Sequence, residues 1–498
     1  MVKVLFVYAN SDIQYWLPIG LASLSAYLKK HGHHVELYDS TKKSFSIIEL
    51  ELNAKISDLN PDLIAISSVS AGIDLAYAMA EFIKKQYDIK ILFGGVHTTN
   101  APEEVISKSF VDMVCIGEGD FALLELVTKM ENKEDYFDTQ NFWFKKDDAI
   151  IKNQVRPLIE NLDSLPFPDR SIFDDKFTLW NDGRINSIHF MAGRGCPFDC
   201  FYCNNSNLTK MYKGKGKYVR MHSVDYVIEE IKSVLKTYGS KSDSPIKISF
   251  VDDTFTLYKK WLTEFCVRYS SEIGLPFACL TRADTVNEEI LLLLKKSGCV
   301  DVSMAIETGN IHLRNKMLNR YQTDEQIINA YKTAKKIGLK TVSYNLIGIP
   351  FETKETIKET IEINKKANPD IVSASILQPY EGLPIYKICK ENGFLIENTA
   401  LTSSQQNKNI HLCPSNLKLP GLSNYDLKKA HDMLSLYVKY PRFLYILFDG
   451  VYYIFYYTGQ RDNLKKFLDI VALYKYVGLK RFIFLVFRKI GIVHRGKC

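Results

Sequence analysis

The sequence predicts an α/β protein with an N-terminal doubly wound parallel sheet, a partial (β/α)6 barrel of the TIM type, and a mainly helical C-terminal region. Two stretches alternate short apolar runs with amphipathic runs of helical period, which is the pattern of parallel strands covered by helices. A third stretch, at the C-terminus, lacks this alternation. We place the domains at residues 1–135, 185–395 and 396–498, and a linker at 136–184.

The composition is that of a globular protein. Of the 498 residues 46% are hydrophobic and 24% are charged, and the net charge of +7 is small for this length. This charge does not indicate a nucleic-acid partner. The ten cysteines do not form the dense framework of a secreted protein, and the first residues lack the apolar core of a signal peptide. We therefore expect a reducing, cytoplasmic setting.

The first domain contains five apolar runs that read as buried strands, with helical patterns between them. The strands are predicted at Val2–Val7, Val35–Tyr38, Leu63–Ser67, Ile89–Gly94 and Met113–Ile116. The helices are predicted at Ile19–Lys30, Ala71–Gln86 and Phe121–Met130. Such a sheet binds ligands at the carboxyl ends of its strands. The linker that follows is rich in Asp, Asn, Lys and Pro, with only short apolar pieces, and we expect it to wrap between the domains.

The second domain repeats the strand–helix alternation six times. Its strands are predicted at Ser187–Met191, Lys247–Val251, Phe277–Leu280, Val300–Ala305, Thr341–Ile347 and Ile371–Ile376. Helical patterns between them include Val224–Tyr238, Glu288–Lys296 and Glu325–Ile337. In a barrel of this kind the chemistry is placed at the C-terminal ends of the strands.

Three cysteines follow the first strand of this second domain at close spacing. Cys196, Cys200 and Cys203 can converge on one iron–sulfur cluster, because thiolates are the ligands that such clusters require. Three ligands leave one iron of a cubane open to a substrate or cofactor. A zinc site would want a fourth ligand nearby, and neither His189 nor His222 has ligand-like spacing. Inert buried thiols do not explain the spacing.

This cysteine motif closely resembles the signature of the radical S-adenosylmethionine superfamily, and the resemblance extends over residues 186–395. It implies a 4Fe–4S cluster, S-adenosylmethionine on the open iron and an external electron donor of the flavodoxin or ferredoxin type. Most of the implied S-adenosylmethionine contacts fall at or just after predicted strand ends, in the order that the family has them. They are Tyr202, Asp252, Asp253, Glu307, Gly348 and Pro350.

The loops of the first domain resemble those of the cobalamin-binding domain that is fused to many radical enzymes. The implied contacts are Pro18, Gly20, Ser67, Ser68, Gly94, Gly95, His97, Gly117, Glu118 and Gly119. No histidine occurs between Met1 and Lys30, so the resemblance implies cobalamin without a histidine lower ligand from the first loop. A sheet retained only for packing is the alternative. Methylthiotransferase relatives carry three cysteines in this domain, whereas this chain has only Cys115.

These resemblances imply an enzyme that methylates an unactivated carbon of a small-molecule or lipid-like substrate. A cobalamin-dependent radical cyclase or rearrangement enzyme, without methyl transfer, fits the same residues. A non-catalytic cobalamin or iron–sulfur regulatory module is the alternative from another class.

The C-terminal region holds two apolar, aromatic segments. Phe443–Tyr457 is shorter than the roughly 20 residues that span a bilayer. Lys475–Cys498 carries seven basic residues and no acidic one. A helical cap over the barrel is the favoured interpretation. The alternative is a helix lying on an anionic membrane, which would place the protein at the periphery of the inner membrane surface.

Overall fold

The computed structural model describes residues 1–10, 15–147, 149–181, 185–396 and 416–458. The chain forms two compact units, Met1–Lys428 and Lys429–Cys498. The first unit contains both predicted sheets. The basic segment Lys475–Cys498 lies outside the described residues, as do residues 11–14, between the first predicted strand and the first predicted helix.

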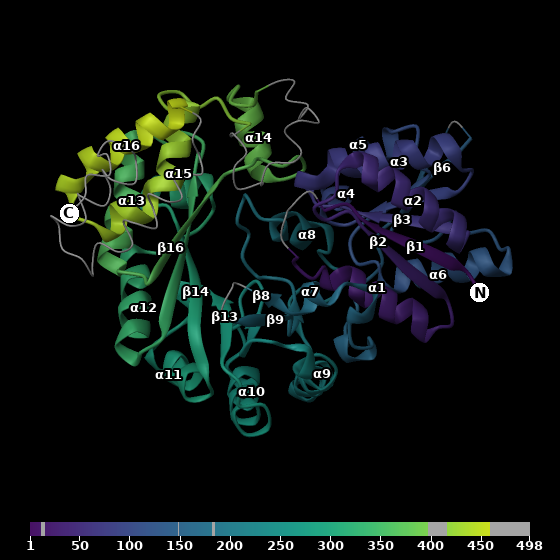
Figure 1. The fold of residues 1–498 in the computed structure, drawn as a ribbon, viewed down its shortest axis with the longest axis horizontal. Coiled ribbons are helices and arrows are strands. Elements are labelled where there is room, and N and C mark those ends of the chain that lie inside the picture. The colour runs from purple at the N-terminus through teal and green to yellow at the C-terminus, as the bar shows by residue number, and fades with distance from the viewer. Residues whose placement is uncertain (11–14, 148, 182–184, 397–415, 459–498) are drawn as a thin grey trace, which may run out of the picture. The chain divides into compact units, whose positions relative to one another are not determined.

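The N-terminal part of the first unit is a seven-stranded sheet in the order β2-β1-β3-β4-β5-β6-β7 (Figure 1). The first five strands run parallel and the last two antiparallel. The strands are β1 (Lys3–Tyr8), β2 (His34–Asp39), β3 (Leu63–Ser67), β4 (Lys90–Gly94), β5 (Met113–Cys115), β6 (Phe142–Lys146) and β7 (Ala149–Lys152). The doubly wound prediction is confirmed.

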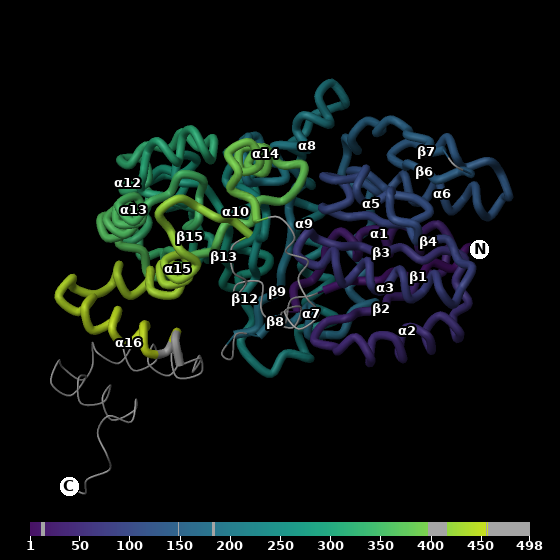
Figure 2. Tube along the Cα trace, turned by 90° about the horizontal axis from the view of Figure 1, so that it is seen from above, coloured from purple at the N-terminus to yellow at the C-terminus, as the bar shows by residue number. Residues whose placement is uncertain are grey.

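Helices cover both faces of this sheet, as its continuously apolar strands require. One face packs against α1 (Ile19–Lys30) and α6 (Asp120–Asn132). The other face packs against α2 (Phe45–Leu59), α3 (Ile73–Gln86) and α5 (Pro102–Ser107). A short helix, α4 (Val96–Asn100), follows β4 directly. Figure 1 shows the strands running between these two helical layers, and Figure 2 shows the same part of the chain turned by 90°.

The linker prediction for residues 136–184 is wrong over the hairpin of β6 and β7. This hairpin extends the N-terminal sheet, with β6 paired antiparallel to β5. Phe142 and Phe144 alternate into the core and are almost fully buried, whereas the other side of the hairpin carries lysines. Five residues of alternation in a polar, proline-rich stretch are a weak signal, and the strand is formed by its pairing with β5.

The second part of the first unit is an open, curled sheet in the order β16-β15-β14-β13-β12-β9-β8, a half-barrel rather than a closed one. Its six main strands are parallel, and the short β8 pairs antiparallel at one edge. The strands are β8 (Trp180–Asn181), β9 (Asn186–Phe190), β12 (Ile246–Phe250), β13 (Phe277–Thr281), β14 (Cys299–Glu307), β15 (Lys340–Ile347) and β16 (Ile371–Ile376). All six predicted strands are present.

The helices of this part are α7 (Asp175–Thr178), α8 (Asn205–Met211), α9 (Val224–Tyr238), α10 (Lys259–Glu272), α11 (Glu288–Lys296), α12 (Asp324–Ile337), α13 (Lys354–Ala367) and α14 (Pro384–Glu391). Capping explains several of their starts. Thr323 and Thr353 each close a capping box at the first turn of α12 and α13, and Gly338 ends α12 in the left-handed region.

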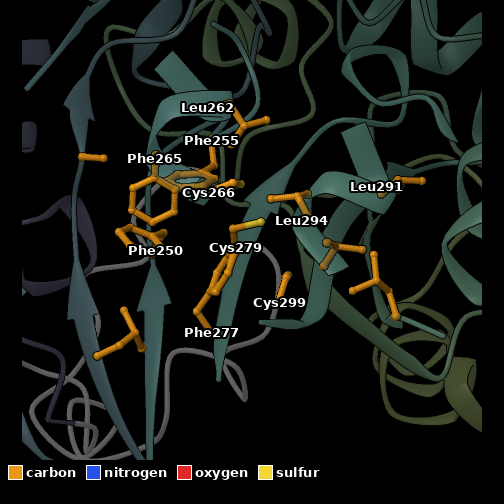
Figure 3. Close-up of a cluster of buried hydrophobic side chains, with 14 of the residues drawn as sticks. Phe250, Phe255, Leu262, Phe265, Cys266, Phe277, Cys279, Leu291, Leu294 and Cys299 are labelled. Atoms are coloured by element: carbon orange, nitrogen blue, oxygen red, sulfur yellow. The ribbon is translucent and has the colours of Figure 1, made fainter. Parts of the chain in front are cut away.

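An aromatic core fills the space between the half-barrel sheet and its helices. Figure 3 shows Phe250, Phe255, Phe265 and Phe277 with the thiol of Cys279 among them. The ring of Phe250 lies 4.5 Å from that of Phe255, 5.2 Å from that of Phe265 and 5.9 Å from that of Phe277. This packing holds β12 and β13, whose ends carry site residues, against α10.

The second unit is helical over its described residues. Helix α15 (Asn424–Lys439) leads into it, and α16 (Tyr445–Thr458) follows after a short turn at Arg442–Leu444. Phe448 and Tyr452 are buried, whereas Phe443 and Ile446 are exposed by 62% and 83%. No described helix is long and apolar enough to cross a membrane.

Candidate functional site

The predicted cluster loop begins on a two-stranded ribbon. Strand β10 (Gly193–Arg194) pairs antiparallel with β11 (Arg220–Met221). A Cβ at Gly193 would lie 2.5 Å from the Arg220 carbonyl oxygen. Gly195 has φ +91°, and a Cβ there would lie 2.6 Å from the Tyr218 carbonyl oxygen. The two glycines before Cys196 are therefore needed for this close backbone approach.

The three predicted cluster cysteines lie on the loop that leaves this ribbon. Cys196 and Cys200 are buried, and Cys203 is partly buried. Burial raises the pKa of the Cys196 thiol, and it raises the pKa of Cys203 to about 11. Cysteine binds metal as the thiolate, so a positive charge such as an iron ion is needed to ionise these buried groups at neutral pH.

Each cysteine sulfur has a polar partner within hydrogen-bond reach. The contacts are Cys196 Sγ with Thr254 Oγ1 at 3.8 Å, Cys200 Sγ with Arg282 Nη1 at 3.6 Å, and Cys203 Sγ with Asn205 Nδ2 at 3.5 Å. Arg282 and Asn205 donate to Cys200 and Cys203, and donors directed at sulfur stabilise a thiolate, which suits these two side chains to cluster ligation. No group of three or more His, Cys, Asp and Glu side chains within the described residues is arranged to hold a single metal ion.

The predicted acidic pair follows β12, as expected, but its two members differ in role. Asp252 accepts hydrogen bonds from the Gly193 N–H at 2.7 Å and from the Ala192 N–H at 3.0 Å. Burial raises the pKa of this carboxyl to about 7, although these two hydrogen bonds oppose the shift. Asp253 accepts from Asn205 Nδ2 at 3.0 Å. Asp252 thus fixes the ribbon, and Asp253 is linked through Asn205 to the cysteine loop.

Glu307 ends β14 with a positive φ of 64° and is almost fully buried. It accepts a hydrogen bond from the Tyr202 hydroxyl at 2.6 Å, and Arg320 Nη1 lies 3.8 Å from the same oxygen. Burial raises the pKa of Glu307, and Arg320 only partly offsets this. The structure therefore joins Glu307 and Tyr202, which are predicted contacts from distant parts of the sequence.

The remaining predicted S-adenosylmethionine contacts follow β15. Gly348 has φ +87°, and its N–H donates to the buried Glu352 carboxylate. Burial raises the pKa of Glu352 to about 8. Pro350 lies within this short loop. The loop is held by Glu352, and the roles of Gly348 and Pro350 toward a ligand stay predictions.

Two arginines that the sequence analysis did not single out converge on Cys200. Arg282 follows β13, and Arg320 lies beyond β14, with Nη1 atoms 3.6 and 3.9 Å from Cys200 Sγ. Both are almost fully buried. Arg282 also lies over the Phe198 ring, 3.5 Å from its centre. The sequence signal that could have identified Arg282 as a site residue is its position just after the predicted strand Phe277–Leu280.

A cavity of about 440 Å³ lies beside the cluster loop. One side is formed by loops of the N-terminal sheet and the other by the ribbon, α8 and α9. Seven predicted cobalamin contacts line it, and they are Gly20, Ser67, Gly94, Gly95, Gly117, Glu118 and Gly119. Pro18, Ser68 and His97 are not among the lining residues. Thr99 and Tyr212, which were not predicted, do line it.

His97 has both ring nitrogens engaged within the N-terminal part. Nδ1 lies 3.0 Å from Ser70 Oγ, and Nε2 lies 3.1 Å from Glu104 Oε2. His97 therefore serves as a hydrogen-bonding residue of this loop. A direct contact of His97 with cobalamin stays a prediction.

Two glycines of the cavity, Gly95 and Gly117, are placed where a side chain would not fit. Gly95 has φ +96°, and a Cβ there would lie 2.8 Å from the Ser68 carbonyl oxygen. Gly117 has φ +78°, and a Cβ there would lie 2.0 Å from the Tyr212 hydroxyl. Both residues therefore allow backbone to line the cavity directly, as a bulky ligand requires.

Two arginines of the ribbon pair with two carboxylates of the loop after β5. Arg194 Nη1 lies 2.8 Å from Asp120 Oδ2, and Arg220 binds both oxygens of Glu118. All four side chains line the cavity. Burial disfavours ionisation of Asp120, but Arg194 outweighs it and holds the pKa of this carboxyl below its usual value. These two ion pairs therefore join the segment after β5 to the ribbon of β10 and β11.

Comparison with known proteins identifies the family. The B12 binding domain family matches residues 7–127, and the Radical SAM superfamily matches residues 191–363. An uncharacterized methyltransferase of Pyrococcus horikoshii is 30% identical over 384 residues, covering 76% of this chain and 80% of the relative. The chain belongs to the cobalamin-dependent radical S-adenosylmethionine enzymes.

Another relative of this radical S-adenosylmethionine enzyme is the anaerobic magnesium-protoporphyrin IX monomethyl ester cyclase of Rubrivivax gelatinosus. It is 27% identical over 415 residues, covering 79% of this chain and 71% of the relative. The structure of the radical S-adenosylmethionine methyltransferase TsrM from Kitasatospora setae, with cobalamin and a 4Fe–4S cluster bound, is also similar. Its TM-score is 0.64 at 17% identity, and the match covers 83% of each chain. The two proteins therefore share a fold.

Proposed function

We propose that this enzyme transfers a methyl group to an unactivated carbon of a small molecule, using a 4Fe–4S cluster and cobalamin. One observation carries the proposal. Arg194 and Gly195, which directly precede the cluster ligand Cys196, line the same cavity as the glycine loops of the B12-binding part. Cobalamin in this cavity would therefore lie beside the cluster, as direct transfer to a substrate radical requires.

The residues present fit these cofactors. Cys196, Cys200 and Cys203 would hold the cluster, and Asp253 and Glu307 would contact S-adenosylmethionine. When bound, the cofactors supply an electron, a hydrogen-abstracting adenosyl radical and a methyl group.

Overall, a substrate C–H bond is replaced by a C–CH3 bond. One S-adenosylmethionine yields methionine and 5′-deoxyadenosine, which carries away the abstracted hydrogen. A second yields S-adenosylhomocysteine and provides the methyl group. The electrons come from an external donor of the flavodoxin or ferredoxin type.

Cyclisation or rearrangement without methyl transfer is the second candidate. The similarity to a magnesium-protoporphyrin cyclase favours it, because that relative carries a name for ring closure and covers most of this chain. Family membership speaks for an enzyme and against the non-catalytic module considered from the sequence.

Product analysis separates these candidates. The protein would be reconstituted without oxygen with iron, sulfide and cobalamin, and then given S-adenosylmethionine and a strong reductant, beside a Cys200→Ala variant. Methyl transfer predicts both 5′-deoxyadenosine and S-adenosylhomocysteine. Deoxyadenosine alone indicates cyclisation or rearrangement. Neither product, with equal iron in the variant, would mean that the proposed function is wrong.

Peripheral membrane contact is a separate part of the proposal, suited to a lipid-like substrate. Helix α16 is apolar around most of its circumference, and Ile446, Tyr453 and Ile454 are exposed on it. The sequence continues from this helix to the basic segment Lys475–Cys498, and a chain with an apolar helix face and a basic segment favours an anionic bilayer surface. Flotation with anionic vesicles tests this, and Ile446→Glu should weaken it. Wild-type protein that stays out of the vesicle fraction at low salt would contradict it.

A further inference from the structure

His222 is a fixed side chain on the barrel side of the cavity. It follows β11 and is 8% exposed. The backbone N–H of His222 donates to the Ala192 carbonyl at 2.8 Å, and the backbone carbonyl of His222 accepts from Trp261 Nε1 at 2.7 Å. Both backbone groups are therefore held, one of them by the chain that leads into the cluster ribbon.

The imidazole ring is held as firmly as the backbone. Nδ1 lies 3.0 Å from Asp163 Oδ1, and the same carboxylate accepts from the Ser223 N–H at 3.0 Å. One face of the ring stacks on Tyr226, with centres 3.9 Å apart and planes 13° from parallel. The ring can neither turn nor move away from the cavity without breaking these contacts.

These contacts also decide which nitrogen carries the proton. A carboxylate only accepts hydrogen bonds, so Nδ1 is the protonated nitrogen, and a neutral ring then presents a lone pair at Nε2. Burial lowers the pKa of His222 to about 4, which keeps the ring neutral at physiological pH. Among the described residues, Nε2 has no hydrogen-bond partner, and it is not one of the atoms sealed from solvent.

The cavity therefore contains a neutral, oriented acceptor that the protein itself does not satisfy. Three carboxylates on the same walls differ from it, because each already holds an arginine. Glu118 binds Arg220, Asp120 binds Arg194, and Glu230 binds Arg170 at 3.2 Å. A ligand that fills the cavity displaces solvent from Nε2 and would leave this acceptor buried without a donor, which is costly, so the ligand should supply an N–H or O–H group.

We propose that His222 Nε2 accepts a hydrogen bond from a carboxamide N–H at the edge of the bound corrin. This inference rests on the proposed placement of cobalamin in the cavity. Cobalamin fits because its ring is bordered by carboxamide groups, each with two N–H donors. Asp163 is then a positioning residue, which acts by fixing the tautomer of His222.

Cobalamin affinity is the direct test, because it does not depend on turnover. The full-length protein would be titrated with hydroxocobalamin, and binding would be followed by equilibrium dialysis for wild type, His222→Leu and His222→Gln. We expect about 3- to 10-fold weaker binding for His222→Leu, the range of one neutral hydrogen bond. His222→Gln, whose amide oxygen can accept a hydrogen bond, should recover part of the lost affinity. His189→Leu removes a buried histidine that does not line the cavity and is the control.

Cobalamin monocarboxylates give a second test, in which the ligand is changed as well as the protein. In these monocarboxylates one carboxamide is replaced by a carboxylate, which has no N–H to donate. At pH 8 the wild type should discriminate against one derivative, and His222→Leu should lose that discrimination. Equal affinity of wild type and His222→Leu, or discrimination unchanged in that variant, would overturn the inference. A wild type that binds no cobalamin would instead refute the proposed function.

Discussion

Arg220 binds Glu118 with two nitrogens, Nη2 at 2.5 Å from Oε1 and Nη1 at 3.1 Å from Oε2. The side chain of Arg220 is 4% exposed and that of Glu118 is 17% exposed. Arg220 also donates to the Ile159 carbonyl at 2.6 Å. A bidentate pair at this depth fixes both distance and orientation, so it sets how the cluster ribbon meets the loop after β5.

Removing one member of this pair should destabilise the protein more than removing both. Arg220→Met leaves the Glu118 carboxylate buried without its main partner, which costs roughly 3–5 kcal/mol. The double variant Arg220→Met/Glu118→Gln should melt above Arg220→Met alone. Thermal melts of the wild type, Arg220→Met, Glu118→Gln and the double variant give the coupling energy between the two residues. Lys232→Met, in an exposed ion pair, should leave the melting temperature unchanged, and additive effects at 118 and 220 would contradict the prediction.

Asp252 should make stability depend on pH. Its pKa in the folded protein is about 7, above the ordinary value, so the folded state binds more protons than the unfolded state between about pH 4 and 7. The free energy of unfolding therefore falls as pH rises through this window. Between pH 5 and 8 the wild type should lose roughly 2–3 kcal/mol that Asp252→Asn does not lose. Urea titrations without cofactors measure this, and parallel pH profiles would refute it.

Gly117→Ala should weaken both folding and cobalamin uptake. The new methyl group would meet the Tyr212 hydroxyl, and the left-handed backbone adds about 1–2 kcal/mol of strain. Adding Tyr212→Ala removes the clash but not the strain, so the double variant should recover only part of the loss. Gly239→Ala is the control, because a Cβ there has open space and an ordinary φ. A Gly117→Ala protein that melts and binds like wild type would show that Tyr212 moves away freely.

Phe250→Ala should be among the most damaging core changes. The ring is fully buried and lies within 6.5 Å of five other aromatic rings, so its loss should cost about 3–5 kcal/mol. Val267→Ala, on the outer face of α10 and 62% exposed, should change the melting temperature little. A small effect at position 250 would mean that the surrounding rings close the space.

Much of the fold could be predicted because the local pattern and the final structure agree. Helices α1, α9 and α11 begin and end at the predicted residues, since each combines a helical apolar stripe with a cap or break. Helix α2 was missed, and its start has no side-chain cap contact. The hairpin of β6 and β7 was missed because its strands depend on pairing with β5.

The site divides in the same way. Spacing along one loop was enough to find the three cysteines, because that signal is local. The capture of Asp252 by the backbone of the ribbon could not be predicted, since those residues are 59 and 60 positions apart. Arg220 and Glu118 are separated by 102 positions. Isolated in sequence, such charges resemble ordinary surface residues, and only the tertiary fold shows that they are buried together.

The β10–β11 ribbon has a consequence for genetics. Its backbone is too close for side chains at Gly193 and Gly195, its end leads into the cluster ligands, and its arginines border the cavity. Mutations in the ribbon will therefore impair both halves of the site together. Alleles that impair S-adenosylmethionine binding or cobalamin binding alone should instead arise in elements that serve one half, such as the loop after β15 or the loop after β3.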